Sequence, residues 1–183
     1  MEEDKSCIVV SACLLGKPVR YDGEFKGEPI IIELAKFVNI IPVCPETAIG
    51  LPSPRPRVFL WQTQDGKVLI IQEGTKKDIT PEIERFCEKF LESVKNKVRA
   101  FILKSKSPSC SPTPTTKMYQ DKEGKICIGK ERGILGKMVI KKFPHLPVFD
   151  ETELKSEKGK EFLLKLFEKL PESIERHLKI FKD

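Results

Sequence analysis

The fold is decided by the segment CIVVSAC, residues 7–13, and by two later segments of the same design, NIIPVC (39–44) and AFILKSKSPSC (100–110). Each begins with a short, continuous apolar run rich in β-branched residues. Such runs are typical of strands that are covered on both faces of a parallel sheet. The three segments therefore predict three parallel strands, each followed by a cysteine.

Helical patterns lie between these strands, which are expected over residues 8–10, 40–43 and 100–103. Residues 28–39 have apolar side chains at helical spacing. Residues 80–97 begin with Thr80 as the expected N-cap and Pro81 at the first helical position. The alternation of strand and helix predicts an α/β fold, with a three-layer, mostly parallel sheet flanked by helices.

Further elements follow from turn signals and periodicity. Residues 58–72 predict a small β-hairpin around Asp65-Gly66, and residues 125–128 predict another short strand. A helix is expected over residues 130–142.

The end of the chain has a helical pattern over residues 156–170, and Pro171 precedes a last helix through Phe181. No linker is long enough to separate domains. We expect one α/β domain over residues 1–155, with residues 156–183 as a C-terminal helical extension packed on that same domain.

Length and composition limit the class of protein. The chain has 183 residues, of which 39% are hydrophobic and 33% charged, so it can bury a core and is not a disordered tail. No apolar run approaches the roughly 18 residues of a membrane span, and the acidic start MEEDKSC lacks the basic region of a signal peptide. These features predict a cytoplasmic protein without membrane contact.

Positive charge is concentrated in one part of the sequence. The net charge is +6, and residues 95–142 hold 13 Lys and Arg against Asp121, Glu123 and Glu131. One interpretation is a solvated, lysine-rich surface. The other is that the basic region 95–142 contacts an anionic partner such as a nucleotide or tRNA.

The six cysteines fall into two groups. Apolar neighbours surround Cys7, Cys87 and Cys127, which we expect to pack in the core. The other three, Cys13, Cys44 and Cys110, each follow a predicted strand. Because ligands gather beyond the carboxyl ends of parallel strands, these three thiols are expected to meet at one edge of the sheet.

Three thiols without a nearby histidine have few chemical uses, and a Cys/His nucleophile pair would have to recruit His145. Soft thiolates favour zinc or an iron–sulfur cluster, but structural zinc commonly uses CxxC pairs, which are absent from the sequence. A [4Fe-4S] cluster on three cysteines would keep one iron open to another ligand. The alternative is that the thiols stay reduced and fill loop corners.

The segments SACLLGKPVRYDG (11–23), PVCPETAIGLPSPRP (42–56), DGKVLIIQEGTKKDIT (65–80) and FILKSKSPSC (101–110) together resemble the DUF523 family of thiouracil desulfurases. The resemblance extends over about residues 7–150, in the same order and with similar spacing. Ser111 stands where family members often have glycine, which could narrow or reshape the pocket.

The resemblance implies a [4Fe-4S] cluster held by Cys13, Cys44 and Cys110, with one iron not ligated by the protein. It also implies catalytic roles for Glu46 and Ser107, with Ser109 as the alternative hydroxyl. The implied reaction is a non-redox desulfuration of a 2-thiouracil-type pyrimidine, as free base or nucleotide, to uracil with release of hydrosulfide.

The residues themselves allow other interpretations of the same positions. Glu46 is also suited to the first turn of a helix that starts near Pro45. The hydroxyls of Ser107 and Ser109 could cap a proline-stiffened turn. Two non-desulfurase functions therefore remain open: a non-catalytic iron–sulfur or zinc-binding protein, and an RNA-associated protein acting on thiolated uridine in tRNA.

Neighbouring charged and aromatic residues are expected to be mainly structural. In RYDG, an Arg20–Asp22 pair is more suited to tying a loop than to reading a pyrimidine, and Arg55 invites the same interpretation. Trp61 is expected to pack in the hairpin.

For two lysines near the third cysteine we expect a role in substrate binding. Lys104 and Lys106 could attract a phosphate, which would favour a thiolated nucleotide over a free base.

Overall fold

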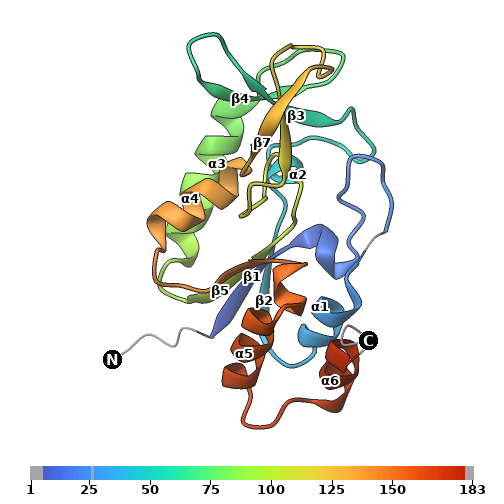
Figure 1. The fold of residues 1–183 in the computed structure, drawn as a ribbon, viewed down its shortest axis with the longest axis vertical. Coiled ribbons are helices and arrows are strands. Elements are labelled where there is room, and N and C mark those ends of the chain that lie inside the picture. The colour runs from blue at the N-terminus through green and yellow to red at the C-terminus, as the bar shows by residue number, and fades with distance from the viewer. Residues whose placement is uncertain (1–5, 26, 180–183) are drawn as a thin grey trace.

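The computed structural model describes residues 6–25 and 27–179, which form two four-stranded sheets with helices around them (Figure 1). Sheet A has the strand order β2-β1-β5-β8, and every neighbouring pair is parallel. Its strands are β1 (Cys7–Ser11), β2 (Asn39–Val43), β5 (Val98–Leu103) and β8 (Val148–Asp150). The three strands predicted from the sequence are thus confirmed, and β8 is added to them.

Alternate residues of β1 pack into two different cores. Ile8 and Val10 lie in a cluster with α1 (Pro29–Leu34), α5 (Glu157–Leu166) and α6 (Glu172–Lys179). Val9 lies in a second cluster with α3 (Thr80–Val94) and α4 (Ile134–Lys142). Helices therefore cover both faces of sheet A, which confirms the three-layer α/β prediction.

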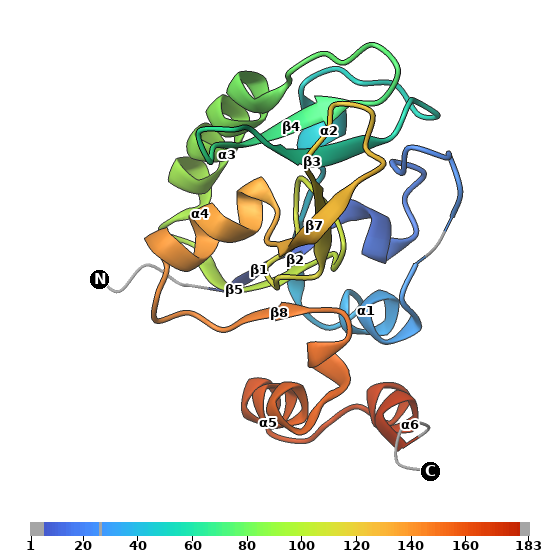
Figure 2. The same ribbon diagram turned by 45° about the horizontal axis from the view of Figure 1, so that its top comes forward.

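Sheet B is a mixed sheet that the sequence predicted only in part. Its strand order is β4-β3-β6-β7, formed by β4 (Val68–Gln72), β3 (Val58–Gln62), β6 (Thr116–Tyr119) and β7 (Cys127–Glu131). Strands β3 and β4 are the predicted hairpin, with Gly66 in the left-handed region. Figure 2 shows sheet B above the carboxyl edge of sheet A.

Several helix boundaries differ from the prediction. The first helix ends at Leu34 rather than at residue 39, because a tight turn follows before β2. Thr80 is not the N-cap of α3: Ile79 occupies that position, and the Thr80 hydroxyl accepts the N–H of Ile70 in β4 at 2.8 Å. The predicted helix over 130–142 begins only at Ile134, since its first residues belong to β7.

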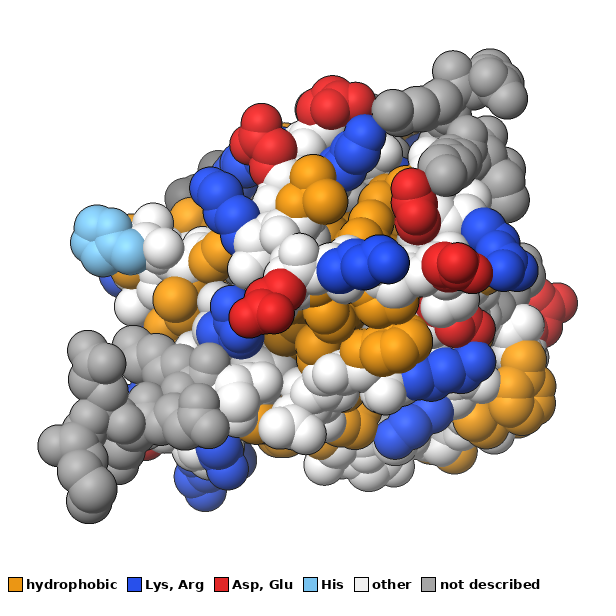
Figure 3. Space-filling model, turned by 90° about the horizontal axis from the view of Figure 1, so that it is seen from below, with side chains coloured by type: hydrophobic (Ala, Val, Ile, Leu, Met, Phe, Trp, Pro, Cys, Tyr) orange, Lys and Arg blue, Asp and Glu red, His pale blue; other side chains and the backbone are white. Residues whose placement is uncertain are grey.

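Helix α5 is shorter than predicted, and both C-terminal helices share a core cluster with α1. Helix α5 ends at Leu166, and the predicted end of the last helix at Phe181 lies outside the described residues. Leu163 and Ile174 are fully buried in the same cluster as Leu34. Figure 3 looks onto this end of the molecule and shows apolar side chains surrounded by charged ones.

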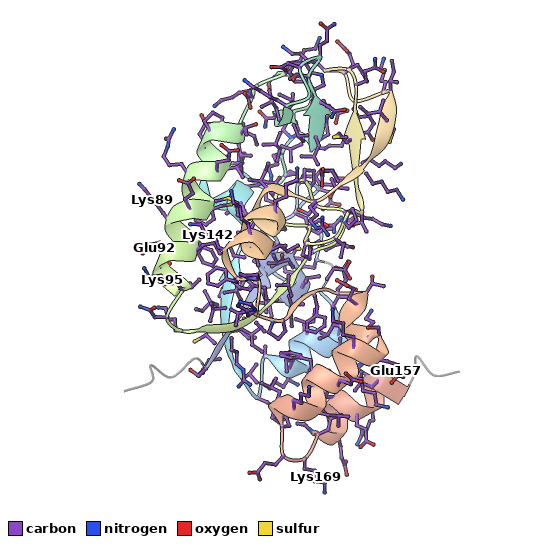
Figure 4. The ribbon with its side chains drawn as sticks, turned by 60° about the vertical axis from the view of Figure 1, so that its left-hand side comes forward. Lys89, Glu92, Lys95, Lys142, Glu157 and Lys169 are labelled. Carbon is purple, nitrogen blue, oxygen red and sulfur yellow. The ribbon has the colours of Figure 1, made fainter. Side chains whose placement is uncertain are left out.

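Some of the positive charge in the 95–142 region is paired within the protein. Figure 4 shows Lys89, Glu92 and Lys95 on the outer side of α3, with Lys142 of α4 near them. Lys95 forms a hydrogen-bonded ion pair with Glu92. The hydrogen bond, together with the charges of Lys95 and Lys142, lowers the pKa of the Glu92 carboxyl. None of the helices within residues 6–25 and 27–179 combines the length and apolar composition needed to cross a bilayer.

Candidate functional site

A cavity of about 530 Å³ lies where the carboxyl edge of sheet A meets sheet B. Cys13, Cys44 and Cys110 all line it, as do Glu46 and Ser107. Each cysteine comes from the loop after a different parallel strand, β1, β2 or β5. The structure therefore brings together the five residues that the sequence singled out, whereas neither His145 nor His177 lines the cavity.

The three thiols have different surroundings. Cys13 lies in a 3-10 turn, η1 (Ala12–Leu15), and its pKa rises to about 11 because of burial, which Lys104 partly offsets. Cys110 is buried, and burial raises its pKa well above the usual value. The charge of Cys44 contributes to both shifts, so the three sulfur atoms share one electrostatic environment.

Cys44 is fixed by the short helix that follows it. It is the N-cap of α2 (Pro45–Ala48), and its Sγ accepts the N–H of Thr47 at 3.5 Å. The same Sγ lies 3.2 Å from the Thr47 hydroxyl. Pro45 at the start of α2 turns the chain so that Glu46, in the first turn, is almost fully buried at the cavity.

Both carboxylate oxygens of Glu46 accept hydrogen bonds. Arg55 donates from Nε to Oε1 at 3.1 Å, and the Ser109 hydroxyl donates to Oε2 at 2.8 Å. The Ser107 hydroxyl lies 3.2 Å from that of Ser109 and accepts the N–H of Cys110 at 3.1 Å. Glu46, Ser109 and Ser107 thus form a hydrogen-bonded row that ends beside Cys110.

A second buried carboxylate, which the sequence did not indicate, lies behind Lys104. Glu151 follows β8 and accepts the Lys104 ammonium at 2.8 Å and the N–H of Ser105 at 2.8 Å. Burial by itself would raise the pKa of Glu151. Hydrogen bonds from Lys104 and Ser105 outweigh it and hold this pKa below its usual value. The charge of Lys104 is therefore paired with that of Glu151. Lys106 is exposed and lines the cavity.

Sheet B supplies the opposite wall, which sequence reasoning missed. Phe59 and Tyr119 line the cavity, and the guanidinium of Arg57 lies 5.5 and 5.6 Å from their ring centroids. Lys117 and Lys130 add two positive charges to this wall. Lys117 and Tyr119 lie on β6, which was not predicted, and Lys130 lies on β7, where a helix was expected.

The loop 19–22 forms the rim of the cavity. Arg20 donates to both carboxylate oxygens of Asp22 at 3.2 and 3.3 Å, which supports the interpretation of this pair as a loop tie. Tyr21 lines the cavity and is 45% exposed. Trp61 is not among the lining residues, and its ring N–H donates to the carbonyl of Gln120.

The remaining cysteines divide differently from the prediction. Cys87 is fully buried in the core, where burial raises its pKa to about 12. Cys7 is half-buried. Cys127 is exposed, so its assignment to the core is wrong; it belongs to β7, an edge strand whose residues are mostly exposed.

Comparison with known proteins adds three findings. Residues 8–151 match the model of a family described as 2-thiouracil desulfurase. The chain is 30% identical over 112 residues to the uncharacterized protein YbbK of Bacillus subtilis (strain 168), covering 56% of this chain and 72% of that one. It also resembles the solved structure of the [4Fe-4S]-dependent thiouracil desulfidase TudS, with a TM-score of 0.67 and 30% identity over 89% of this chain and 100% of the other.

Proposed function

Since the chain belongs to the 2-thiouracil desulfurase family, we propose that it removes the sulfur atom of a thiolated pyrimidine and releases it as hydrosulfide. The observation that carries this proposal is the content of one cavity. Three thiols from three strand ends line it together with a buried carboxylate and the Ser107 hydroxyl. This is the set of groups that cluster-assisted hydrolysis requires.

The proposed cofactor is a [4Fe-4S] cluster on Cys13, Cys44 and Cys110, with one iron free of protein ligands. Thiolates are the soft donors that iron–sulfur clusters prefer. Within the described part of the chain, no three His, Cys, Asp or Glu side chains are grouped to hold a single metal ion. The three cysteines that line the cavity would instead hold a larger centre with several iron atoms. When bound, the cluster would supply a Lewis acid for the substrate sulfur.

The chemistry balances without an electron donor. The oxygen of water bonds to the ring carbon, the carbon–sulfur bond breaks, and the sulfur leaves as hydrosulfide with one of the water protons. Glu46 accepts the second proton as general base. Ser107 donates a hydrogen bond to the substrate and is the hydroxyl that we assign to proton transfer.

The charge of the cavity favours a thiolated nucleotide over a free base. The volume of about 530 Å³ has to hold both the cluster and the substrate, so it does not distinguish the two substrates. Lys106, Lys117 and Lys130 line this space and would attract a phosphate. We therefore expect a lower KM for the 5′-monophosphate of thiouridine than for 2-thiouracil.

The test is anaerobic reconstitution with iron and sulfide, followed by incubation with 2-thiouracil or the thiolated nucleotide. Uracil or its nucleotide and free sulfide should appear in equal amounts. Bound cluster without turnover would identify a non-catalytic iron–sulfur protein instead. Glu46→Ala should keep the cluster and lose activity; loss of both would make Glu46 a structural residue.

The ligand assignment has its own matched set of variants. Replacement of Cys13, Cys44 or Cys110 by Ala should lower iron content, whereas Ala at Cys7 or Cys87 should not. A gel shift with tRNA over a series of salt concentrations tests the RNA alternative, and absence of binding at low salt removes it.

A further inference from the structure

Arg55 carries a buried charge at the site that the proposed chemistry does not use. Its side chain is only 2% exposed although it lines the cavity, and its hydrogen-bond donors are directed at acceptors of the protein itself. It nevertheless donates hydrogen bonds in three directions. Nε reaches Oε1 of Glu46 at 3.1 Å, Nη1 reaches the carbonyl of Pro52 at 3.0 Å, and Nη2 reaches the carbonyl of Val19 at 2.7 Å.

The same residue holds the rim of the cavity. The backbone N–H of Arg55 donates to the carbonyl of Tyr21 at 2.7 Å, and the neighbouring Ser53 hydroxyl donates to the carbonyl of Arg20 at 2.5 Å. Val19, Arg20 and Tyr21 all line the cavity. One planar guanidinium therefore joins the Glu46 carboxylate to the rim loop.

Removal of this guanidinium would leave Glu46 with one of its two side-chain hydrogen bonds. The Ser109 hydroxyl would still hold Oε2, but Oε1 would have no partner that fixes its direction. The carboxylate could then rotate about its last side-chain bond. A general base must stay within hydrogen-bond reach of the proton that it removes, so such freedom slows the chemical step.

We propose that Arg55 is a positioning residue that holds the Glu46 carboxylate and the loop 19–21 in the arrangement that the reaction needs. This role rests on the proposed function, because it acts through Glu46. The side-chain hydrogen bonds of Arg55 go to Glu46 and to the carbonyls of Pro52 and Val19.

The test uses anaerobically reconstituted protein with a thiolated pyrimidine. Arg55→Met should lower kcat by about tenfold to a hundredfold while iron and sulfide content per chain stay unchanged. Arg55→Lys keeps the charge but can reach fewer of the partners, so its kcat should fall between that of the wild type and that of Arg55→Met. If Arg55→Met does not fold, Arg55→Lys alone must still show the decrease.

A double-mutant cycle separates positioning from general stability. Glu46→Asp pulls the carboxylate back from Arg55 by one methylene. Arg55→Met added to that variant should change kcat by less than about threefold, because both substitutions remove the same contact. Equal effects of Arg55→Met in the two backgrounds would show that Arg55 acts independently of Glu46 and would overturn the proposal.

Lys155→Met provides the control. Lys155 forms a half-buried ion pair with Glu28 at 2.7 Å, away from the cavity, so its loss should lower the melting temperature without changing kcat. An unchanged kcat or a loss of iron in Arg55→Met would each contradict the positioning role. Absence of turnover in the wild-type protein would instead remove the proposed function, and this role with it.

Discussion

Ser107 and Ser109 lie in the same turn but differ in what they can reach. Ser109 is 1% exposed, and its hydroxyl is committed to Glu46. Ser107 is half-buried and lines the cavity, while its oxygen accepts the N–H of Cys110. Because Ser109 donates its proton to Glu46, Ser107 is the donor in the contact between the two hydroxyls, and a ligand in the cavity could replace Ser109 as its acceptor. The sequence allowed both residues as the proton-transfer group, and the geometry favours Ser107.

We therefore expect Ser107→Ala to lower kcat by about a hundredfold or more, as for loss of a general acid or base. Ser109→Ala should lower kcat by about tenfold, because it removes one hydrogen bond from Glu46 and leaves the Ser107 hydroxyl in place. Steady-state rates of sulfide release, normalised to iron content, measure both effects. The opposite order would assign proton transfer to Ser109.

Glu151 predicts a dependence of stability on pH. Its pKa is lower in the folded protein than its ordinary value of 4.5, despite burial, because of the hydrogen bonds from Lys104 and Ser105. A lowered native pKa means that the unfolded chain binds the proton more readily. The stabilisation is therefore complete above pH 4.5 and is lost as the pH falls through the native pKa.

Glu151→Gln should accordingly lower the free energy of unfolding at pH 7 and flatten its decrease below pH 4.5. Denaturant unfolding of the apoprotein at several pH values measures this. Glu157→Gln, at an exposed position at the start of α5, is the control and should keep the wild-type profile. A wild-type slope in Glu151→Gln would contradict the assigned role of the Lys104–Glu151 pair.

At the scale of elements, the start of α4 holds the loop that carries Cys110. The N–H groups of Gly133, Ile134 and Leu135 donate to carbonyls of that loop at 2.8, 3.0 and 2.9 Å. The backbones can approach because Gly133 and Gly136 both face this loop and have no side chain. A Cβ on Gly136 would lie 1.9 Å from the carbonyl oxygen of Ser111.

Gly136→Ala should therefore push the loop away from α4 and lower both the melting temperature and the iron content after reconstitution. Overpacking of this kind typically costs about 1–3 kcal/mol of stability. Lys141→Ala, on the exposed side of the same helix, is the control and should change neither quantity. Full iron content in Gly136→Ala would show that the loop does not depend on this contact.

The elements also show why the sequence predicted some parts of the site and not others. Strands β1 and β5 are buried between helices and β2 is a half-buried edge strand, but all three are apolar runs whose pattern is strong enough to place the three cysteines. Strand β6 pairs with β3 at only two positions, Leu60 with Met118 and Trp61 with Tyr119, and has no apolar run. Strand β8 has three residues. The sheet B wall and Glu151 depend on these two short strands, so local patterns did not indicate them.

At the scale of the whole molecule, two sheets and a C-terminal extension must stay together for the cavity to exist. Sheet A supplies the thiols and sheet B the opposite wall, and Val9 and Leu60 share one core cluster. On the other face of sheet A, the extension covers α1, which follows the rim loop in the chain. Because the helices of the extension share the core of sheet A, we expect the extension and the α/β domain to unfold as one cooperative unit.

Two adjacent leucines of α5 test this expectation. Leu163 is fully buried in the core cluster that also holds residues of α1 and sheet A, whereas Leu164 is 51% exposed. Leu163→Ala should lower the free energy of unfolding by about 2–5 kcal/mol, and Leu164→Ala should leave it nearly unchanged. The decisive observation is the form of the denaturant transition, followed by far-UV circular dichroism and by the fluorescence of Trp61 in sheet B. If Leu163→Ala produces an early transition in the dichroism while Trp61 unfolds at its wild-type midpoint, the extension melts on its own. Coincident transitions shifted together would show that helices far from the cavity help to hold both of its walls in place.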